Sequence, residues 1–199
     1  MKSKNEIIKN FFIKDKILGN LAKNRPLPSL DIYGSKGPFL ALLEAIISQQ
    51  LSSKVATSLY QRFEQFISGK IDIPRYLSKR EINELRNLGI SRAKAECIIE
   101  LSRMVQKREI DFETVNKNTN EAITETLTKV KGIGVWTVNM FLIFGLKRED
   151  IWPFTDFGIR KNLSTILGKK EILSLSETEK IGERWKPYRS YASCYIWKN

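Results

Sequence analysis

Apolar residues recur every three to four positions along most of the 199-residue chain, which is the period of one face of an α-helix. In the segment 38–50, for example, Leu40, Leu43, Ile46 and Ile47 share such a face. No convincing stretch alternates between apolar and polar residues as a half-buried strand would. The pattern therefore predicts an all-α protein.

Capping residues and helix breakers set the expected helix limits. Ser78 with Glu81, and Ser176 with Glu179, match the capping box, in which two side chains bond each other's backbone N–H groups at a helix start. Thr155 is a further expected N-cap. We expect a Pro/Gly-rich connector over 23–38 and helices over about 4–20, 38–50, 52–67, 78–88, 91–107, 119–130, 135–145 and 155–167, with two more from about 176 and from 187.

Composition indicates an ordinary folded protein and favours a polyanionic partner. Hydrophobic residues make up 42% and charged residues 28%, which suits one domain or two small subdomains with a core. The formal net charge is +12, and the sequence pI is about 9.7. Such an excess favours nucleic acid first and an acidic membrane surface second, although a merely solubilising surface would carry the same charge.

The chain contains no histidine, which excludes Ser-His-Asp and Cys-His catalysis and any His-ligated metal. Its two cysteines, Cys97 and Cys194, are too few for a Cys-only zinc site or an iron–sulfur cluster and suggest reduced thiols. No signal peptide and no run of about eighteen apolar residues occurs. We therefore expect a cytoplasmic protein that needs no cofactor, contacts no membrane and uses Asp, Glu, Lys, Tyr, Ser or Thr for any chemistry.

The stretch VKGIGVWTVNMF (130–141) interrupts a helical pattern with Gly132 and Gly134. A dinucleotide-binding loop would need a preceding strand and a third glycine where Thr137 stands, so that interpretation is weak. A helix–hairpin–helix fits better, because the glycines let backbone N–H groups approach a phosphate, beside the positive helix end and Lys131. The alternative is a helix corner where the glycines only allow close packing, and the glycine stretch alone favours neither.

Asp156, in EDIWPFTDFGIRKNL (149–163), is the candidate catalytic group. An acidic residue at a helix start can serve only as a cap, since it suits the helix dipole. Asp156, however, follows the glycine turn by one short helix, lies behind aromatic residues and precedes Arg160 and Lys161, which suit a helix facing DNA. In a chain without histidine, a carboxylate is also among the few groups that could activate water.

Three segments in this order resemble the helix–hairpin–helix DNA glycosylase superfamily. LLEAIISQQLSSKVATSLYQRF (42–63) is similar to the segment that enters the groove beside a lesion. VKGIGVWTVNMFLIFGLKREDIWPFTDFGIRKNL (130–163) resembles the hairpin and catalytic loop. ERWKPYRSYASCYIW (183–197) resembles the C-terminus of the alkylation-repair branch, 3-methyladenine DNA glycosylase II.

The resemblance implies a fold and its division. We expect an all-α helix–hairpin–helix glycosylase fold in a compact form, without the N-terminal β domain that bacterial members can carry. A six-helix barrel subdomain would span 38–150 and contain the hairpin at about 122–145. It would pack on a helical subdomain formed by residues 1–37 and 151–199.

The resemblance also assigns roles around the lesion. Asp156 would be the catalytic carboxylate, which stabilises positive charge on the sugar and orients water. Bifunctional relatives carry a Schiff-base lysine where this chain has Trp136, so we expect a monofunctional enzyme without lyase activity. Trp136 and Trp197 match aromatic residues of the base pocket, and Met140 stands where the family can have a pocket tyrosine. Either tryptophan could instead be part of the core.

Contacts with the DNA backbone follow from the same resemblance. Gln50 would fill the gap left by the extruded base, with Gln49 and Leu51 beside it, unless the segment is an ordinary turn between helices. The expected phosphate contacts are Lys131, Gly132, Ile133, Gly134 and Thr137. By analogy alone, backbone carbonyls would hold a monovalent cation, Na⁺ or K⁺, and these are the carbonyls of Thr128, Val130 and Ile133.

The leading hypothesis is a base excision repair enzyme that flips alkylated purines of the 3-methyladenine type out of duplex DNA and hydrolyses their N-glycosidic bond. The same fold could instead act on another damaged base, such as hypoxanthine or ethenoadenine. A third possibility is a non-catalytic helix–hairpin–helix protein that only binds DNA. In each case we expect a monomer in the cytoplasm, associated with the nucleoid if the source is prokaryotic.

Overall fold

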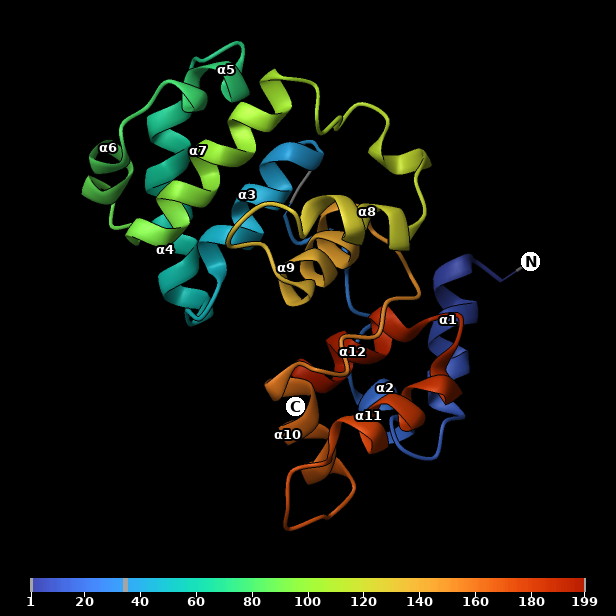
Figure 1. The fold of residues 1–199 in the computed structure, drawn as a ribbon. Coiled ribbons are helices and arrows are strands. Elements are labelled where there is room, and N and C mark those ends of the chain that lie inside the picture. Colours follow the sequence, from blue (N-terminus) through green and yellow to red (C-terminus); the bar gives the residue numbers. More distant parts are fainter. Residues whose placement is uncertain (1, 34–35, 199) are drawn as a thin grey trace. The chain divides into compact units, whose positions relative to one another are not determined.

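The computed structural model describes residues 2–33 and 36–198, and all regular elements within them are helices, as the sequence predicts (Figure 1). Two short 3₁₀ helices (η1, η3) and one π-helix (η2) accompany the α-helices. In chain order the elements are α1 (Lys4–Ile13), α2 (Gly19–Asn24), α3 (Pro38–Ser48), α4 (Ser53–Ile67), α5 (Ile73–Ser78), α6 (Ile82–Asn87), α7 (Arg92–Gln106), η1 (Val115–Lys117), α8 (Asn120–Leu127), α9 (Val135–Met140), η2 (Phe141–Gly145), α10 (Phe157–Ile166), α11 (Leu175–Gly182), η3 (Glu183–Trp185) and α12 (Arg189–Trp197).

The chain divides into two compact units. Unit 1 comprises Met1–Ile32 and Lys147–Asn199, and unit 2 comprises Tyr33–Leu146. The divisions lie a few residues before those expected from the sequence. Tyr33 packs edge-on against Phe144 inside unit 2, with ring centroids 5.6 Å apart. Lys147 pairs with Asp31 inside unit 1 at 3.1 Å. These two contacts assign the connecting residues to their units.

Helix α3 is the central element of unit 2. It contacts α4, α7, α9 and η2, while α5 and α6 pack on α7 and α8 packs on α9 (Figure 1). Pro38 begins the helix, where its missing N–H leaves no hydrogen bond unmade. A helix surrounded in this way needs apolar residues on several sides. The buried residues of α3 are Ala41, Leu42, Leu43, Ala45, Ile46 and Ile47.

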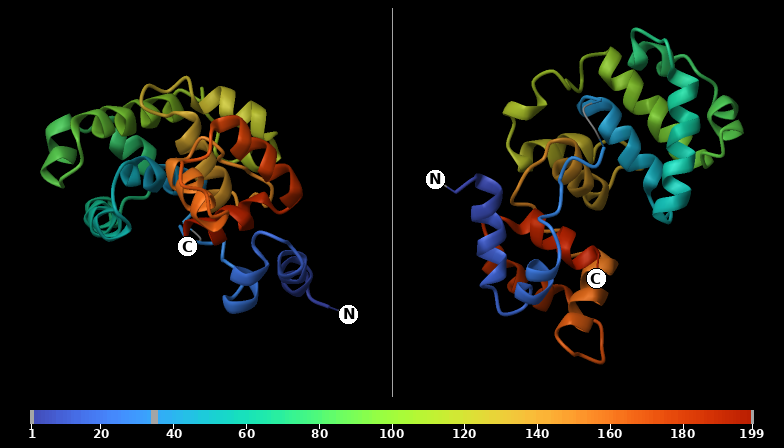
Figure 2. Two further views of the ribbon diagram at one scale, coloured as in Figure 1. Left: turned by 90° about the horizontal axis from the view of Figure 1, so that it is seen from below. Right: turned by 180° about the vertical axis from the view of Figure 1, so that it is seen from behind.

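The two ends of the described chain share the core of unit 1 (Figure 2). Phe12 of α1 packs against Tyr195 of α12, with ring centroids 5.4 Å apart. Trp152, which follows η2 in the chain, packs against Trp185 of η3 at 5.2 Å. Helix α12 also packs on α10, the helix that begins beside Asp156. The first helix of the chain therefore stabilises the unit that carries the candidate catalytic residue.

The predicted start of α10 is wrong by one residue. Asp156, and not Thr155, is the N-cap, because its Oδ1 accepts the backbone N–H of Ile159 at 2.7 Å. Both residue types are good N-caps, so the sequence could not separate them. The result places the candidate catalytic carboxylate at the helix N-terminus itself.

Other helix limits also differ from those predicted. The capping box of α11 is formed by Ser174 and Glu177, two residues before the predicted pair. Ser78 ends α5, and Glu81 caps α6. The helix predicted over 4–20 is split into α1 and α2, and the last begins at Arg189 rather than Pro187.

The helix predicted over 135–145 forms as α9 followed by the π-helix η2. Its last residue, Gly145, is closely packed: an added Cβ would lie 2.7 Å from Phe141 Cδ2 and 2.9 Å from Ala41 Cβ. No helix in the described part of the chain has the length and apolar character needed to cross a bilayer.

Candidate active site and nucleic-acid interface

The Asp156 carboxylate is held from two directions inside unit 1. Its Oδ1 accepts the N–H of Ile159, in the first turn of α10, at 2.7 Å. The same oxygen accepts the indole Nε1–H of Trp197, at the end of α12, at 2.9 Å. The side chain is half-buried. Two donors on different helices fix its direction.

Gly158 leaves room for this pair. A Cβ at that position would lie 3.1 Å from Asp156 Oδ1 and 3.5 Å from Trp197 Cδ1. Trp197 itself is half-buried. The structure thus brings together two predicted site residues and adds a hydrogen bond that the sequence did not reveal. The base-pocket role of Trp197 stays a prediction.

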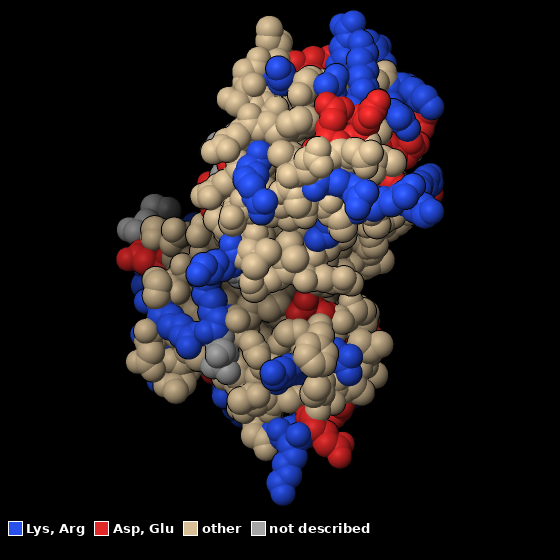
Figure 3. Space-filling model, turned by 90° about the vertical axis from the view of Figure 1, so that its left-hand side faces the viewer, with Lys and Arg blue, Asp and Glu red and all other residues tan. Residues whose placement is uncertain are grey.

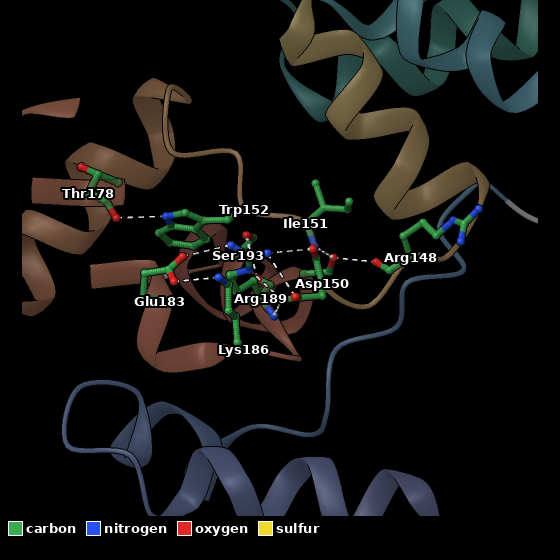
Figure 4. Close-up of polar contacts among 10 residues, drawn as sticks. Arg148, Asp150, Ile151, Trp152, Thr178, Glu183, Lys186, Arg189 and Ser193 are labelled. Atoms are coloured by element: carbon green, nitrogen blue, oxygen red, sulfur yellow. Dashed lines mark hydrogen bonds and ion pairs between the residues drawn. The ribbon is translucent and has the colours of Figure 1, made fainter. Parts of the chain in front are cut away.

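The loop before Asp156 is anchored to the start of α12 (Figure 4). The Arg189 guanidinium makes a two-point ion pair with Asp150, Nε to Oδ1 at 2.6 Å and Nη2 to Oδ2 at 3.1 Å. Ser190 Oγ accepts the N–H of Ile151 at 3.0 Å and donates to the carbonyl of Arg148 at 2.6 Å. Bidentate arginine pairs fix geometry as well as charge. Helix α12 therefore holds both the loop and, through its other end, the carboxylate.

Trp152 anchors the same loop to α11. Its indole Nε1–H donates to the Thr178 carbonyl at 3.0 Å (Figure 4). The ring lies against Gly182, where an added Cβ would be 2.2 Å from Trp152 Nε1. Trp152 is 8% exposed, so it belongs to the core.

In unit 2, the two glycines of the hairpin differ in what they require. Gly132 has φ +97°, a left-handed conformation that favours glycine, and a Cβ there would lie 3.1 Å from Cys97 Cβ. Gly134, the N-cap of α9, has φ −100°, and a Cβ would meet nothing within 4 Å. Of these two positions, only 132 requires glycine for the turn to form. The open space at Gly134 suits close approach by another molecule.

The hydrogen bonds of the hairpin divide the predicted phosphate-binding set. The Ile133 N–H donates to the Val130 carbonyl at 3.0 Å, inside the turn. Thr137 is 2% exposed, and its Oγ1 accepts a hydrogen bond from Gln49 at 2.7 Å. Lys131, Gly132 and Gly134 are thus the exposed members of the set, while Ile133 and Thr137 shape the turn from inside. The phosphate contacts of all five residues stay predictions.

The predicted wedge residues lie in a tight turn between α3 and α4. Gln50 is exposed and has φ +56°, whereas Leu51 is half-buried. The amide of Gln49 points into the protein and donates to the Gly132 carbonyl at 3.1 Å as well as to Thr137. The wedge assignments of Gln50 and Leu51 stay predictions, while Gln49 has a contact that the sequence did not suggest.

The remaining predicted pocket residues belong to α9. Trp136 is half-buried, and Met140 is 5% exposed and so lies in the core of unit 2. Phe157, immediately after Asp156, was not among the predicted site residues. Its large apolar side chain is 62% exposed, next to the candidate catalytic carboxylate in the chain. An aromatic residue directly after an acidic N-cap could have drawn attention to it.

Groups of Lys and Arg side chains are scattered over the face in Figure 3, with fewer Asp and Glu, while other residues cover most of it. Not every cation is available to a ligand. Arg160, expected on a DNA-facing helix, donates from Nε to the Leu173 carbonyl at 2.8 Å. Three C-terminal cations, Arg184, Lys186 and Arg189, pair with Asp15, Glu183 and Asp150 respectively.

The predicted cation ligands lie after α8 in unit 2. Thr128 is the C-cap of α8, where carbonyls lack partners within the helix. The Val130 carbonyl accepts one N–H and keeps a second lone pair. Such oxygens suit a hard monovalent ion chemically. Among the described residues, no cluster of three or more His, Cys, Asp or Glu could hold a metal.

Comparison with known proteins identifies the family. Residues 43–187 match the model of the HhH-GPD superfamily of base excision DNA repair proteins. This chain belongs to that superfamily. The matched region includes the hairpin, the wedge turn and the loop that ends at Asp156.

Individual relatives agree with this membership. The chain is 31% identical over 185 residues to DNA-3-methyladenine glycosylase 1 of Schizosaccharomyces pombe, covering 92% of this chain and 78% of that protein. It is 28% identical over 189 residues to DNA-3-methyladenine glycosylase 2 of Escherichia coli, covering 90% of this chain and 63% of the relative. The solved structure of the S. pombe enzyme, Mag1, in complex with abasic DNA superposes with a TM-score of 0.87, 28% identity and coverage of 96% and 95%.

Proposed function

We propose that this protein is a monofunctional DNA glycosylase that removes alkylated purines of the 3-methyladenine type from duplex DNA. The observation that carries the proposal is the Asp156 carboxylate, fixed at one oxygen by Ile159 N–H and Trp197 Nε1–H. Its support is membership of a base excision repair family and similarity to two proteins named DNA-3-methyladenine glycosylase.

The carboxylate suits hydrolysis of an N-glycosidic bond. As the bond from C1′ to the base nitrogen breaks, the base takes the bonding electrons and positive charge develops on the sugar. A carboxylate held in advance stabilises that charge without reorganising. Water then adds its oxygen to C1′ and loses a proton, which gives an abasic site and the free base. An alkylated purine that is already cationic leaves as a neutral base, so strong protonation by the enzyme is not needed.

The sequence argues against strand cleavage by a Schiff base. The position that would hold a lysine nucleophile is Trp136. Lys131 lies in the hairpin turn, before its two glycines, and is exposed. The half-buried indoles of Trp136 and Trp197 are aromatic surfaces that suit a cationic base, worth about 0.5–2 kcal/mol for each contact.

DNA binding follows from charge and from the hairpin. The net charge of +12 favours a polyanion, and the open backbone at Gly134 lets a phosphate approach beside Lys131. Affinity should fall with salt by a log–log slope of about −0.9 for each phosphate neutralised. The carbonyls of Thr128, Val130 and Ile133 would hold a monovalent cation, whose charge would attract a phosphate. We expect the protein to act as a monomer in the compartment that contains the DNA.

The test uses duplexes that each carry one defined lesion, followed by alkaline cleavage of abasic sites. We expect excision of 3-methyladenine-type lesions, and a loss of about 100-fold or more in Asp156→Asn, comparable to loss of a preorganised catalytic dipole. Folding and duplex affinity should be retained, because Asn keeps an oxygen for both donors. Asp111→Asn, at an exposed loop position, is the matched control.

Each other outcome has a definite meaning. Near-wild-type turnover by Asp156→Asn would refute the catalytic assignment. Excision confined to hypoxanthine or ethenoadenine would leave the fold assignment intact and would change the assigned substrate. Binding without excision of any lesion would identify a non-catalytic DNA-binding protein. A covalent adduct trapped with borohydride would contradict the absence of lyase activity.

A further inference from the structure

Gln49 joins two parts of unit 2 that are far apart in the sequence. It directly follows α3, yet its Nε2 donates to the Gly132 carbonyl at 3.1 Å and to Thr137 Oγ1 at 2.7 Å. Gly132 lies in the hairpin turn, and Thr137 is in the first turn of α9. One amide group therefore bridges both sides of the hairpin. Thr137 is 2% exposed, so the hydrogen bond to its Oγ1 is partly shielded from competing water, whereas the bond to the Gly132 carbonyl is exposed.

Lys94 holds the backbone of the same turn. Its ammonium donates to the carbonyls of Ile47 at 2.8 Å and Gln49 at 2.6 Å, at the C-terminal end of α3. A cation is favourable there, because those carbonyls carry the negative end of the helix dipole. Lys94 lies in the first turn of α7, whose N-cap is Ser91, where a cation is unfavourable. Its position is thus explained by α3 rather than by its own helix.

Helix α7 supports the hairpin through the same face. Lys94 and Cys97 are three residues apart, which places them side by side on a helix. Cys97 lies directly beneath Gly132, where an added Cβ would be 3.1 Å from Cys97 Cβ and 3.3 Å from its Sγ. Burial raises the pKa of the Cys97 thiol to about 12, so it packs there as a neutral group. The turn and the hairpin therefore share one support.

Gln50, at the tip of the turn, is the residue whose position this support determines. Its φ of +56° is left-handed, a conformation that residues other than glycine rarely adopt. Its side chain is exposed. A strained residue persists where its surroundings over-determine it. On the side of the turn that precedes Gln50, the hydrogen bonds made by Gln49 and Lys94 provide this constraint.

We propose that Gln49 is a positioning residue, and not a wedge, that fastens the Gln50 turn to the hairpin so that the phosphate contact and base extrusion act as one rigid body. This inference rests on the proposed function. A phosphate held at Gly134 then fixes where Gln50 meets the base stack. Without the link, the hairpin still binds duplex DNA, but Gln50 no longer keeps one position relative to it.

The test compares the wild-type protein with Gln49→Met, which keeps the length of the side chain and removes its donor. The probe is a duplex with a tetrahydrofuran abasic-site analogue beside 2-aminopurine, whose fluorescence rises when stacking is disrupted. At saturating protein, we expect the rise in 2-aminopurine fluorescence to be several-fold smaller for Gln49→Met than for the wild type. The affinity of Gln49→Met for undamaged duplex should stay within about twofold of the wild-type value. Excision of the preferred lesion should fall about 10- to 100-fold in kcat, as for other small misplacements.

Two further measurements separate positioning from general damage to the fold. Amide hydrogen exchange over residues 130–138 should be faster in Gln49→Met than in the wild type without DNA. Thr137→Val should weaken the fluorescence rise, and the double variant should lose little more, because both changes break the same contact. Gln61→Met, at an exposed position on α4, should behave like the wild type throughout.

The opposing results are distinct. An unchanged fluorescence rise in Gln49→Met, or additive effects of the Gln49 and Thr137 changes, would overturn the proposal. So would a loss of undamaged-duplex affinity equal to the loss of signal, since Gln49 would then serve the hairpin alone. If the wild type excised no lesion, the proposed function would fail, while the exchange and fluorescence comparisons would still decide the role of Gln49.

Discussion

The indole Nε1–H of Trp197 donates to Asp156 Oδ1 at 2.9 Å, joining residues that are 41 positions apart in the chain. The contact links the end of α12 to the beginning of α10. Because Arg189 and Ser190 at the other end of α12 hold the preceding loop, one helix fixes both the carboxylate and the chain that carries it. Helix α12 thereby holds the Asp156 side chain directly and the backbone that leads to it through the loop.

Trp197→Phe separates the donor from the aromatic ring. The variant keeps a stacking surface and loses the N–H. A hydrogen bond to a charged group contributes about 1.5–3 kcal/mol, so excision should slow by about 10- to 100-fold if the contact acts in the transition state. Single-turnover excision checks this, with the melting temperature as control. An unchanged rate would show that Ile159 N–H alone orients the carboxylate.

Gly158→Ala should separate stability from activity. Alanine is better than glycine inside a helix by about 1 kcal/mol, so the melting temperature should stay or rise. The added methyl group would crowd Asp156 Oδ1 at 3.1 Å, so excision should fall. Thr165→Ala, at an exposed position on the same helix, controls for helix propensity. Full activity in Gly158→Ala would mean that the Asp156–Trp197 pair tolerates displacement.

The two hairpin glycines should respond differently to alanine. Gly132→Ala forces a left-handed alanine, which costs about 1–2 kcal/mol, and adds a contact with Cys97 at 3.1 Å. We expect lower resistance to urea. Gly134→Ala should unfold like the wild type and bind duplex DNA more weakly, because the methyl group occupies the open approach. Equal stability losses in both variants would contradict this division, as would unchanged DNA affinity in Gly134→Ala.

Glu44, in α3, should make stability depend on pH. Burial raises its pKa from 4.5 to about 7, and Oε2 is buried without a hydrogen-bond partner in the described part of the chain. The folded state therefore holds the proton more tightly, and this group's contribution to stability is lost as pH rises from about 4.5 to about 7. Glu44→Gln should be more stable than the wild type at pH 8 and gain less at pH 5. Urea unfolding at both values checks this, and a parallel pH dependence in the variant would exclude Glu44 as the cause.

The sequence predicted the elements that local signals specify. Helices with a clear apolar face and one good cap, such as α7 after Ser91, begin where expected. Errors arose where two capping residues stand side by side, as with Thr155 and Asp156, or where a side chain breaks a helix locally. Asp15 is such a case, because its Oδ1 accepts the N–H groups of Ile17 and Leu18 between α1 and α2.

Site residues were predictable by type, and their contacts were not. Asp156 stood out because histidine is absent and the motif surrounds it. Its bond to Trp197 depends on how α10 and α12 pack, which no local pattern encodes. Positions 49 and 50 are both glutamine, so residue type does not distinguish them. The left-handed turn directs the Gln49 side chain inward and the Gln50 side chain to the surface.

The division of the chain has a consequence for its synthesis. Unit 2 is continuous, from Tyr33 to Leu146, whereas unit 1 is assembled from segments on either side of it. A ribosome therefore completes the hairpin before it has made Asp156, and domains made first generally fold first. Trp197 emerges later still, so a nascent chain completes the hairpin well before it can form the hydrogen bond from Trp197 to Asp156.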